Sequence, residues 1–236
     1  MSTKLKLTAP LAITIAVLAF LYVEFTANFS FHWVTDGSLG NGLDMPAKFH
    51  LVIPIGFLTW GLFFVLGANT DAIKLVAINV VIGCAAALIC IVMIHAIKKF
   101  PDFWGISLSV AILAFVLVMS SAVSDLVNIP TIFVVFAGCL LWWLATGADG
   151  WFAGAATHTP AGVAQTLAKG GGGSGAGAFF GILSTPYGFV ILNCFATLLV
   201  GLAFGVASAR IAALLTPSPA AAEADAHAEG ARPSPA

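Results

Sequence analysis

Charged residues are scarce in this chain. Only 8% of its 236 residues are Asp, Glu, Lys or Arg, against about 25% in soluble globular domains. Hydrophobic residues make up 60%, and the mean hydropathy is +1.05. So few charges cannot cover a water-facing surface, which excludes a soluble domain of ordinary composition. The net charge of −1 gives no basic field for nucleic acid, so we expect no nucleic acid partner.

Motifs for metal or covalent chemistry are equally scarce. The four cysteines lie inside long apolar segments and form no CxxC pair, so we interpret them as small apolar residues rather than a disulfide framework or a zinc site. His95, Asp125 and His158 come from different segments, and no HxxxH or ExxH spacing occurs. The sequence therefore predicts a protein that is not an enzyme and that carries no cofactor.

Long apolar segments are what the chain has instead. A helix needs about 20 apolar residues to cross a bilayer, and six segments approach that length: 8–27, 50–67, 73–97, 104–124, 128–146 and 186–215. We predict an all-α polytopic protein of about six transmembrane helices, in one domain over residues 1–215, with a lipid bilayer around it. A signal peptide is the alternative for the first segment, but no clear cleavage site follows it, so a retained helix is favoured.

Two regions differ from the apolar segments. Residues 150–185 include the run GGGGSG, which predicts a flexible surface loop. The alternative is a short helix after Thr159-Pro160 that dips into the membrane, with His158 just before its N-terminus. Residues 216–236 are rich in Ala, Pro and Glu and predict a disordered tail.

A repeat is visible inside the chain. "IPIGFLTWGLFFVLGANTD" (53–71) and "IPTIFVVFAGCLLWWLATGAD" (129–149) both open with Ile-Pro, place Phe three residues after the Pro, and close with Gly-Ala before an Asp. Proline suits the first turn of a helix because its missing N–H would be unpaired there anyway. Pro54 and Pro130, which are 76 residues apart, therefore predict two helix starts, and Asn128 is placed to cap the second.

The following segments repeat as well. "KLVAINVVIG" (74–83) resembles "GFVILNCFAT" (188–197), with Asn79 opposite Asn193. If three helices make one unit, the halves 8–97 and 104–215 must have opposite orientations in the membrane. Such a 3+3 inverted repeat is a common plan of transporters and channels, with the solute site near the midplane. The alternative is chance similarity between apolar segments.

Few polar residues fall inside the predicted spans, and they are the candidates for a solute pathway. Asn79 and Asn193 have either that role or the role of hydrogen bonding a neighbouring helix. Trp60, in mid-span, indicates either a pore constriction or a helix contact. Asp125 lies in "SAVSDLVNIPT" at a membrane edge, where a simple turn is favoured over an active carboxylate. His158 belongs to the Gly-rich loop.

The basic residues indicate the orientation. Lys4 and Lys6 precede the first span, which predicts a cytoplasmic N-terminus, and six spans then return the C-terminus to the cytoplasm. Arg210 agrees with this topology, whereas Lys98 and Lys99 would lie outside.

The Ile-Pro-x-x-Phe openings, the aromatic stretches ending in Gly-Ala, and the Asn-bearing helices that follow resemble the YcdZ-like inner-membrane family, domain of unknown function 1097. The resemblance covers about residues 47–213. It implies a polytopic inner-membrane protein and carries no catalytic residues.

Together these patterns favour an integral membrane channel or transporter-like protein for a small solute, acting as a homo-oligomer or in a membrane complex. The alternative is a structural or accessory subunit of a larger membrane complex, because apolar spans with few polar groups suit packing against partners.

Overall fold

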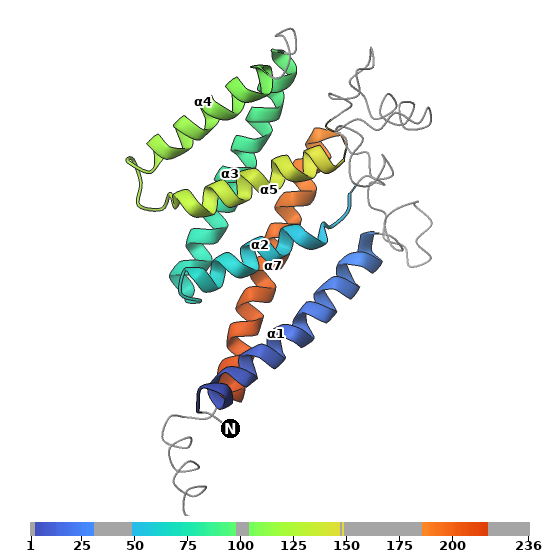
Figure 1. The fold of residues 1–236 in the computed structure, drawn as a ribbon, viewed down its shortest axis with the longest axis vertical. Coiled ribbons are helices and arrows are strands. Elements are labelled where there is room, and N and C mark those ends of the chain that lie inside the picture. Colours follow the sequence, from blue (N-terminus) through green and yellow to red (C-terminus); the bar gives the residue numbers. More distant parts are fainter. Residues whose placement is uncertain (1–2, 31–48, 98–103, 147, 149–185, 217–236) are drawn as a thin grey trace, which may run out of the picture.

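A computed structural model describes residues 3–30, 49–97, 104–146, 148 and 186–216 of the chain (Figure 1). These residues form helices and, within that part of the chain, no strand. The helices are α1 (Thr3–Asn28), α2 (Ile53–Val65), α3 (Thr70–Ala96), α4 (Trp104–Ser120), α5 (Ile129–Ala145) and α7 (Tyr187–Leu215). The prediction of an all-α protein is confirmed. The predicted loop at 150–185 falls wholly outside the described residues, as does nearly all of the predicted tail.

The two Ile-Pro pairs begin helices, as predicted. Pro54 and Pro130 each lie in the first turn, of α2 and α5 respectively. Asn128 caps α5, since its Oδ1 accepts a hydrogen bond from the backbone N–H of Thr131 at 3.0 Å. The sequence therefore predicted these starts correctly from local chemistry alone.

An alanine with the same uncommon backbone conformation follows each of these two helices. Ala68 and Ala148 have φ values of 54° and 49°, the left-handed region that non-glycine residues rarely adopt. Gly67 has φ 96°, and the Gly67 and Ala68 N–H groups donate to the carbonyls of Phe64 and Phe63. These bonds satisfy carbonyls that the end of α2 would otherwise leave unpaired.

The helices fall into two length classes. Residues 8–28 of α1, all 27 residues of α3 and all 29 of α7 are long and apolar enough to cross a membrane, whereas α2 has 13 residues and α4 and α5 have 17 each. Thirteen helical residues rise only about 20 Å, against a hydrocarbon core of about 30 Å. The described structure is thus that of a membrane protein with three full-length spans, and crossing by all six helices stays a prediction.

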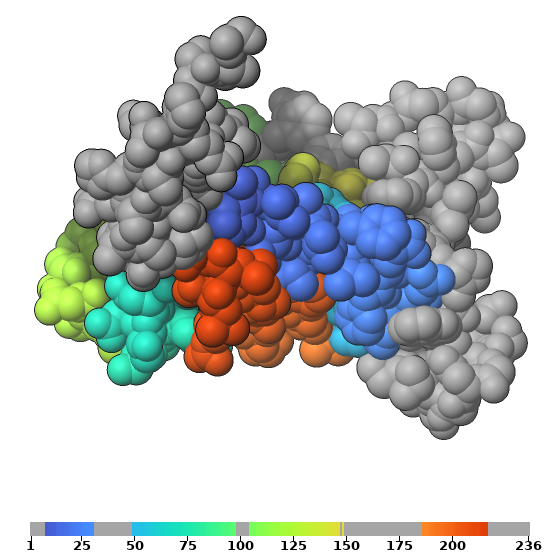
Figure 2. Space-filling model, turned by 90° about the horizontal axis from the view of Figure 1, so that it is seen from below, coloured from blue at the N-terminus to red at the C-terminus, as the bar shows by residue number. Residues whose placement is uncertain are grey.

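The packing is organised around α3 and α7, which contact each other. Helix α2 packs against α7, and α5 packs against α3, so each short helix lies on a long helix from the other part of the chain. Helix α1 flanks α7, and α4 flanks α3 (Figure 1). Figure 2 shows α1 in blue beside α7 in red, with α3 in teal on the far side of α7. The buried core therefore lies between the short helices and the two central ones.

Two glycines allow the closest of these approaches. The position of a Cβ on Gly201 of α7 is already occupied by the backbone of Gly56 in α2. A Cβ on Gly83 of α3 would lie 2.6 Å from a methyl group of Val135 in α5. Small residues at helix crossings let backbones approach closely, as is common between helices in membranes.

The outer helices present apolar side chains to their surroundings. Phe20 of α1 is 65% exposed and Phe115 of α4 is 68% exposed. Many other large apolar side chains on these two helices are also exposed. Contiguous apolar surface of this kind is rare on soluble monomers and indicates a lipid environment.

Candidate functional site

Asn79 of α3 is fully buried and bonds to the chain just before α5. Its Nδ2 donates to the carbonyl of Leu126 at 2.9 Å and to that of Leu75, one turn back in α3, at 2.6 Å. Its Oδ1 accepts from the N–H of Asn128 at 2.9 Å. We call this set the α5 clamp (Asn79 with Leu126 and Asn128).

Asn193 of α7 is also fully buried and bonds to the chain just before α2. Its Oδ1 accepts from the N–H of His50 at 3.2 Å, and its Nδ2 lies 3.2 Å and 3.3 Å from the two ring nitrogens of His50. One turn on, the Thr197 hydroxyl accepts from the N–H of Val52 at 3.0 Å. We call this set the α2 clamp (Asn193 and Thr197 with His50 and Val52).

The two clamps hold corresponding backbone positions, although one asparagine makes both contacts in the α5 clamp and Asn193 and Thr197 share them in the α2 clamp. His50 and Val52 precede Pro54 by the same distances as Leu126 and Asn128 precede Pro130. In each clamp the polar side chain belongs to the long helix of one predicted half, and the bonded backbone lies just before the short helix of the other. Of the two alternatives for Asn79 and Asn193, bonding to neighbouring elements accounts for these contacts, and a role in solute passage stays a prediction.

The α2 clamp contains a histidine that the sequence reading did not select. His50 is 6% exposed, and its ring lies 5.6 Å from that of Trp142. The hydroxyl of Ser30, at the end of α1, exchanges hydrogen bonds of 2.9 Å and 3.0 Å with the backbone of Leu51. His50 was missed because it stands at the edge of an apolar run, although a lone polar residue four before a helix-starting proline was a usable signal.

Trp60 is a helix contact in this structure. It is 4% exposed, and its indole N–H donates to the hydroxyl of Ser208 in α7 at 3.0 Å. Its ring packs on Tyr22 of α1, on Phe57 in α2 and on Phe204 in α7. This hydrogen bond and these contacts tie α1, α2 and α7 together, and a pore constriction at Trp60 stays a prediction.

The other two candidates are not brought to the clamps. Asp125 is exposed in the turn between α4 and α5, next to the α5 clamp but directed to the outside. The turn is closed by local bonds, among them one from the N–H of Leu126 to the Ser124 hydroxyl at 3.2 Å. His158 lies outside the described residues.

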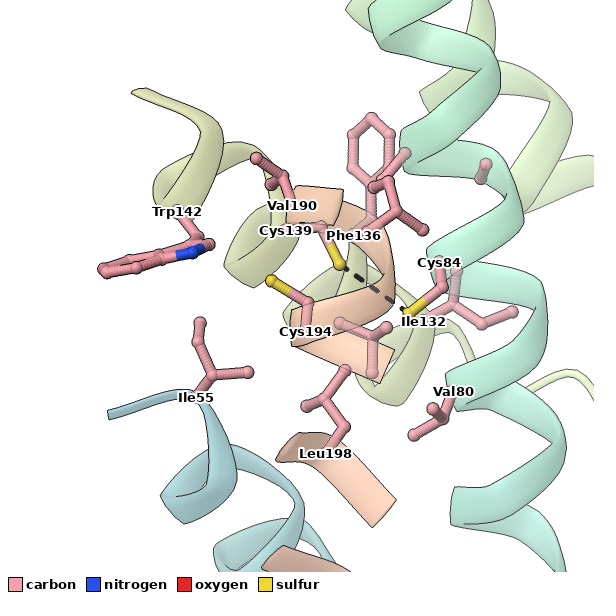
Figure 3. Packing of buried hydrophobic residues seen from close by; sticks show 14 of the residues in the cluster. Ile55, Val80, Cys84, Ile132, Phe136, Cys139, Trp142, Val190, Cys194 and Leu198 are labelled. Atoms are coloured by element: carbon pink, nitrogen blue, oxygen red, sulfur yellow. Dashed lines mark hydrogen bonds between the residues drawn. The ribbon is translucent and has the colours of Figure 1, made fainter. Parts of the chain in front are cut away.

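Three cysteines meet in the core, which the sequence reading did not foresee. Cys84, Cys139 and Cys194 come from α3, α5 and α7, and the first two sulfurs are 3.7 Å apart (Figure 3). Val80, Ile132 and Leu198 surround them. All three side chains are buried, as cysteines that act as small apolar residues usually are. Among the residues that the structure describes, no group of three His, Cys, Asp or Glu side chains is arranged to hold a metal ion.

A cavity of about 640 Å³ lies between α4 and α5. Its wall is made of apolar side chains only, including Val110 and Ala114 of α4, Phe133, Phe136 and Leu144 of α5, and Leu58 of α2. Such a wall offers no hydrogen bond to a polar solute. We call this cavity the α4–α5 groove.

The comparisons with known proteins identify the family and no activity. The model of the family described as "Protein of unknown function (DUF1097)" matches residues 12–213, from the first third of α1 to the last turn of α7. This is the family that the Ile-Pro and Asn motifs indicated, and the match extends further toward the N-terminus than the expected 47–213. No curated protein and no solved structure matches the chain. The chain therefore belongs to the DUF1097 family of proteins of unknown function.

Proposed function

We propose that this protein is an integral channel or transporter-like protein for a small solute in the inner membrane. In this proposal all six helices cross the bilayer as a 3+3 inverted repeat, and both termini are cytoplasmic. The observation that carries the proposal is the reciprocal pair of clamps. Asn79 holds the start of α5, and Asn193 holds the start of α2.

The packing supports the repeat. Exchanging α1, α2 and α3 with α4, α5 and α7 turns the contact of α2 with α7 into that of α5 with α3. The same exchange turns the contact of α1 with α7 into that of α4 with α3, and leaves the central contact of α3 with α7 unchanged. The left-handed residues Ala68 and Ala148, which end the two short helices, are also exchanged. These matching long-range contacts support the repeat over chance similarity between apolar segments.

The clamps support a transport function because they hold non-helical backbone in the buried interior. Residues 49–52 are non-helical, yet Leu51 and Val52 are 7% and 2% exposed. Non-helical backbone at membrane depth is tolerated only where protein or a water-filled cavity satisfies it. Interrupted and shortened helices of this kind carry the solute site in many transporters.

The solute is expected to be small and uncharged or weakly acidic. Charge is nearly absent from the helices, and ion-pair networks that would couple a proton or ion gradient are lacking in the described residues, where the one salt bridge is the exposed pair Lys74–Asp71. The pathway candidates remain Asn79, Asn193, Trp60, Asp125 and His158. In this proposal the protein is not an enzyme, uses no cofactor and acts as a homo-oligomer or in a membrane complex.

Flux measurements test the proposal. Purified protein in liposomes should speed the equilibration of one or more solutes from a panel of small uncharged and weakly acidic compounds. Variants Asn79→Asp and Asn193→Asp, which keep the shape of the amide, should alter that flux, whereas Ser121→Ala on the exposed end of α4 should not. Absence of flux above empty vesicles across the panel would overturn the proposal.

An accessory subunit is the second candidate, and a specific observation favours it. Both polar atoms of the Asn79 side chain are engaged in hydrogen bonds, and the α4–α5 groove has no polar wall. Neither feature by itself offers a polar path through one copy of the chain. Stoichiometric co-purification of other membrane subunits in a mild detergent, together with no solute flux in the liposome assay, would favour this function over a channel.

A further inference from the structure

The corner between α1 and α2 is filled by one aromatic side chain. Tyr22 of α1 is fully buried, and its hydroxyl donates to the carbonyl of Ile53 at 2.9 Å. Its ring centroid lies 5.1 Å from that of Phe57, 6.1 Å from that of Trp60 and 5.3 Å from that of Phe204. These edge-to-face contacts leave no room at the first two turns of α2.

The corresponding corner between α4 and α5 is open. Phe133 and Phe136 follow Pro130 at the same spacing as Phe57 and Trp60 follow Pro54, and both line the α4–α5 groove. Among the described residues, α4 contributes only Val110 and Ala114 to the wall, so no side chain of α4 takes the place that Tyr22 of α1 has in the other half. The comparison of the two halves rests on the proposed repeat.

The chemistry of the groove restricts what can fill it. Every side chain in its wall is apolar, so a water or polar solute inside would find none of the two to four partners that a buried water needs. Along α5 the wall runs from Phe133 to Leu144, a rise of about 16 Å. That length exceeds a single side chain inserted from a second copy and suits an extended hydrocarbon chain.

The lipid around a membrane protein supplies such a hydrocarbon chain. Outside the groove wall, helix α4 exposes Phe115 at 68% and Val118 at 44%, and such exposed apolar residues face lipid in a membrane protein. We propose that the α4–α5 groove is a binding site for one acyl chain of a membrane phospholipid, which fills the corner as Tyr22 fills the other. The headgroup stays outside, because the wall offers it no partner.

Native mass spectrometry of the full-length protein with a diacyl phosphatidylcholine tests the site. The variant Ala114→Phe places an aromatic ring in the groove, as Tyr22 does between α1 and α2. Ala111→Phe makes the same change one turn away on the exposed face of α4, outside the wall, and is the matched control. We expect wild type and Ala111→Phe to retain phospholipid after mild detergent washing, and Ala114→Phe to lose it.

The thermal midpoint in detergent gives a second readout. Filling an empty groove should raise the midpoint of Ala114→Phe in delipidated samples, and added phosphatidylcholine should then raise only wild type and Ala111→Phe. Equal lipid retention by all three proteins would overturn the site. So would a dimer that Ala114→Phe dissociates, because the groove would then hold a second copy. A failed flux assay leaves these outcomes unchanged, so the two proposals fail separately.

Discussion

The α1–α2 corner and the α4–α5 corner have the same helical plan but different contents. In the first, Tyr22 hydrogen-bonds Ile53 and Trp60 hydrogen-bonds Ser208, so side chains fix three helices together. In the second, α4 supplies Val110 and Ala114, and the equivalent volume stays open. The two halves therefore match in their helix starts and in the clamps that hold the backbone. They differ in the side chains that fill the two corners. One corner is structural, and the other is available to a ligand.

Emptying the filled corner should have the largest effect. Tyr22→Ala removes a fully buried ring and the hydroxyl that satisfies the Ile53 carbonyl. We expect the free energy of unfolding to fall by about 3–5 kcal/mol, as for other large buried aromatics. Unfolding in mixed micelles, followed by circular dichroism, measures it. Phe20→Ala on the exposed side of α1 is the control. A similarly small loss of unfolding free energy in both variants would contradict the conclusion that Tyr22 holds the α1–α2 corner together.

The second largest loss of stability is expected from glycine substitutions at the two helix crossings, and the two losses should differ. Gly201→Ala places a methyl group against the backbone of Gly56, which cannot move without shifting α2. Gly83→Ala meets Cγ1 and Cβ of Val135 at 2.6 Å and 2.8 Å. The Val135 Cβ does not move when the rotamer changes, so α5 must shift, but the overlap is smaller than that with the Gly56 backbone at Gly201. We expect Gly201→Ala to cost about 3 kcal/mol and Gly83→Ala about 1 kcal/mol in the same unfolding assay. A larger cost at Gly83 would mean that α3 and α5, not α2 and α7, form the tighter pair.

The clamps should have equal effects if the halves are related. Asn79→Ala leaves the Asn128 N–H without its partner, and Asn193→Ala does the same to the His50 N–H. Each orphaned buried group costs about 1–3 kcal/mol, so we expect about 2 kcal/mol from either variant. Ser120→Ala, whose hydroxyl bonds only within its own helix end, should be nearly silent. Loss in one clamp variant alone would argue against the repeat.

The helix ends should show the smallest effects, with a sign opposite to the others. Ala68 and Ala148 are left-handed, a conformation that costs a non-glycine residue about 1–2 kcal/mol. Ala68→Gly removes that cost but gains chain entropy in the unfolded state, so we expect a net stabilisation of about 0.5 kcal/mol. Ala148 is fully buried, so Ala148→Gly also loses a buried methyl group worth about 0.8 kcal/mol and should change stability little. Ala77→Gly, inside α3, should instead destabilise by about 1 kcal/mol. The thermal midpoint distinguishes these signs.

Local chemistry made much of the fold predictable. Hydropathy located every described helix, and proline together with Asn128 located the starts of α2 and α5. The predicted segment 50–67 was too long, because hydropathy does not distinguish a helix from a buried extended chain. Residues 49–52 are apolar or aromatic like the helix that follows. The N–H groups of His50 and Val52 bond to α7, and that of Leu51 bonds to the Ser30 hydroxyl, instead of continuing the helix.

The candidate site was less predictable because its contacts are long-range. The repeat pointed to Asn79 and Asn193 together, but nothing in the sequence states that each bonds the start of a helix in the other half. The cysteine cluster likewise depends on how α3, α5 and α7 cross. The α4–α5 groove depends on small side chains at Val110 and Ala114, which read in the sequence as ordinary members of an apolar run.

The α2 clamp also imposes an order on biosynthesis. The N–H groups of His50 and Val52 bond to acceptors that lie 143 and 145 residues later in the chain, so they are synthesised before their partners. At about 5–20 residues per second, a ribosome needs roughly 7–30 s to supply them. During that interval the start of α2 depends on water, lipid headgroups or an insertion factor. A chain that stops before α7 would leave both N–H groups without the acceptors that they have in the folded protein.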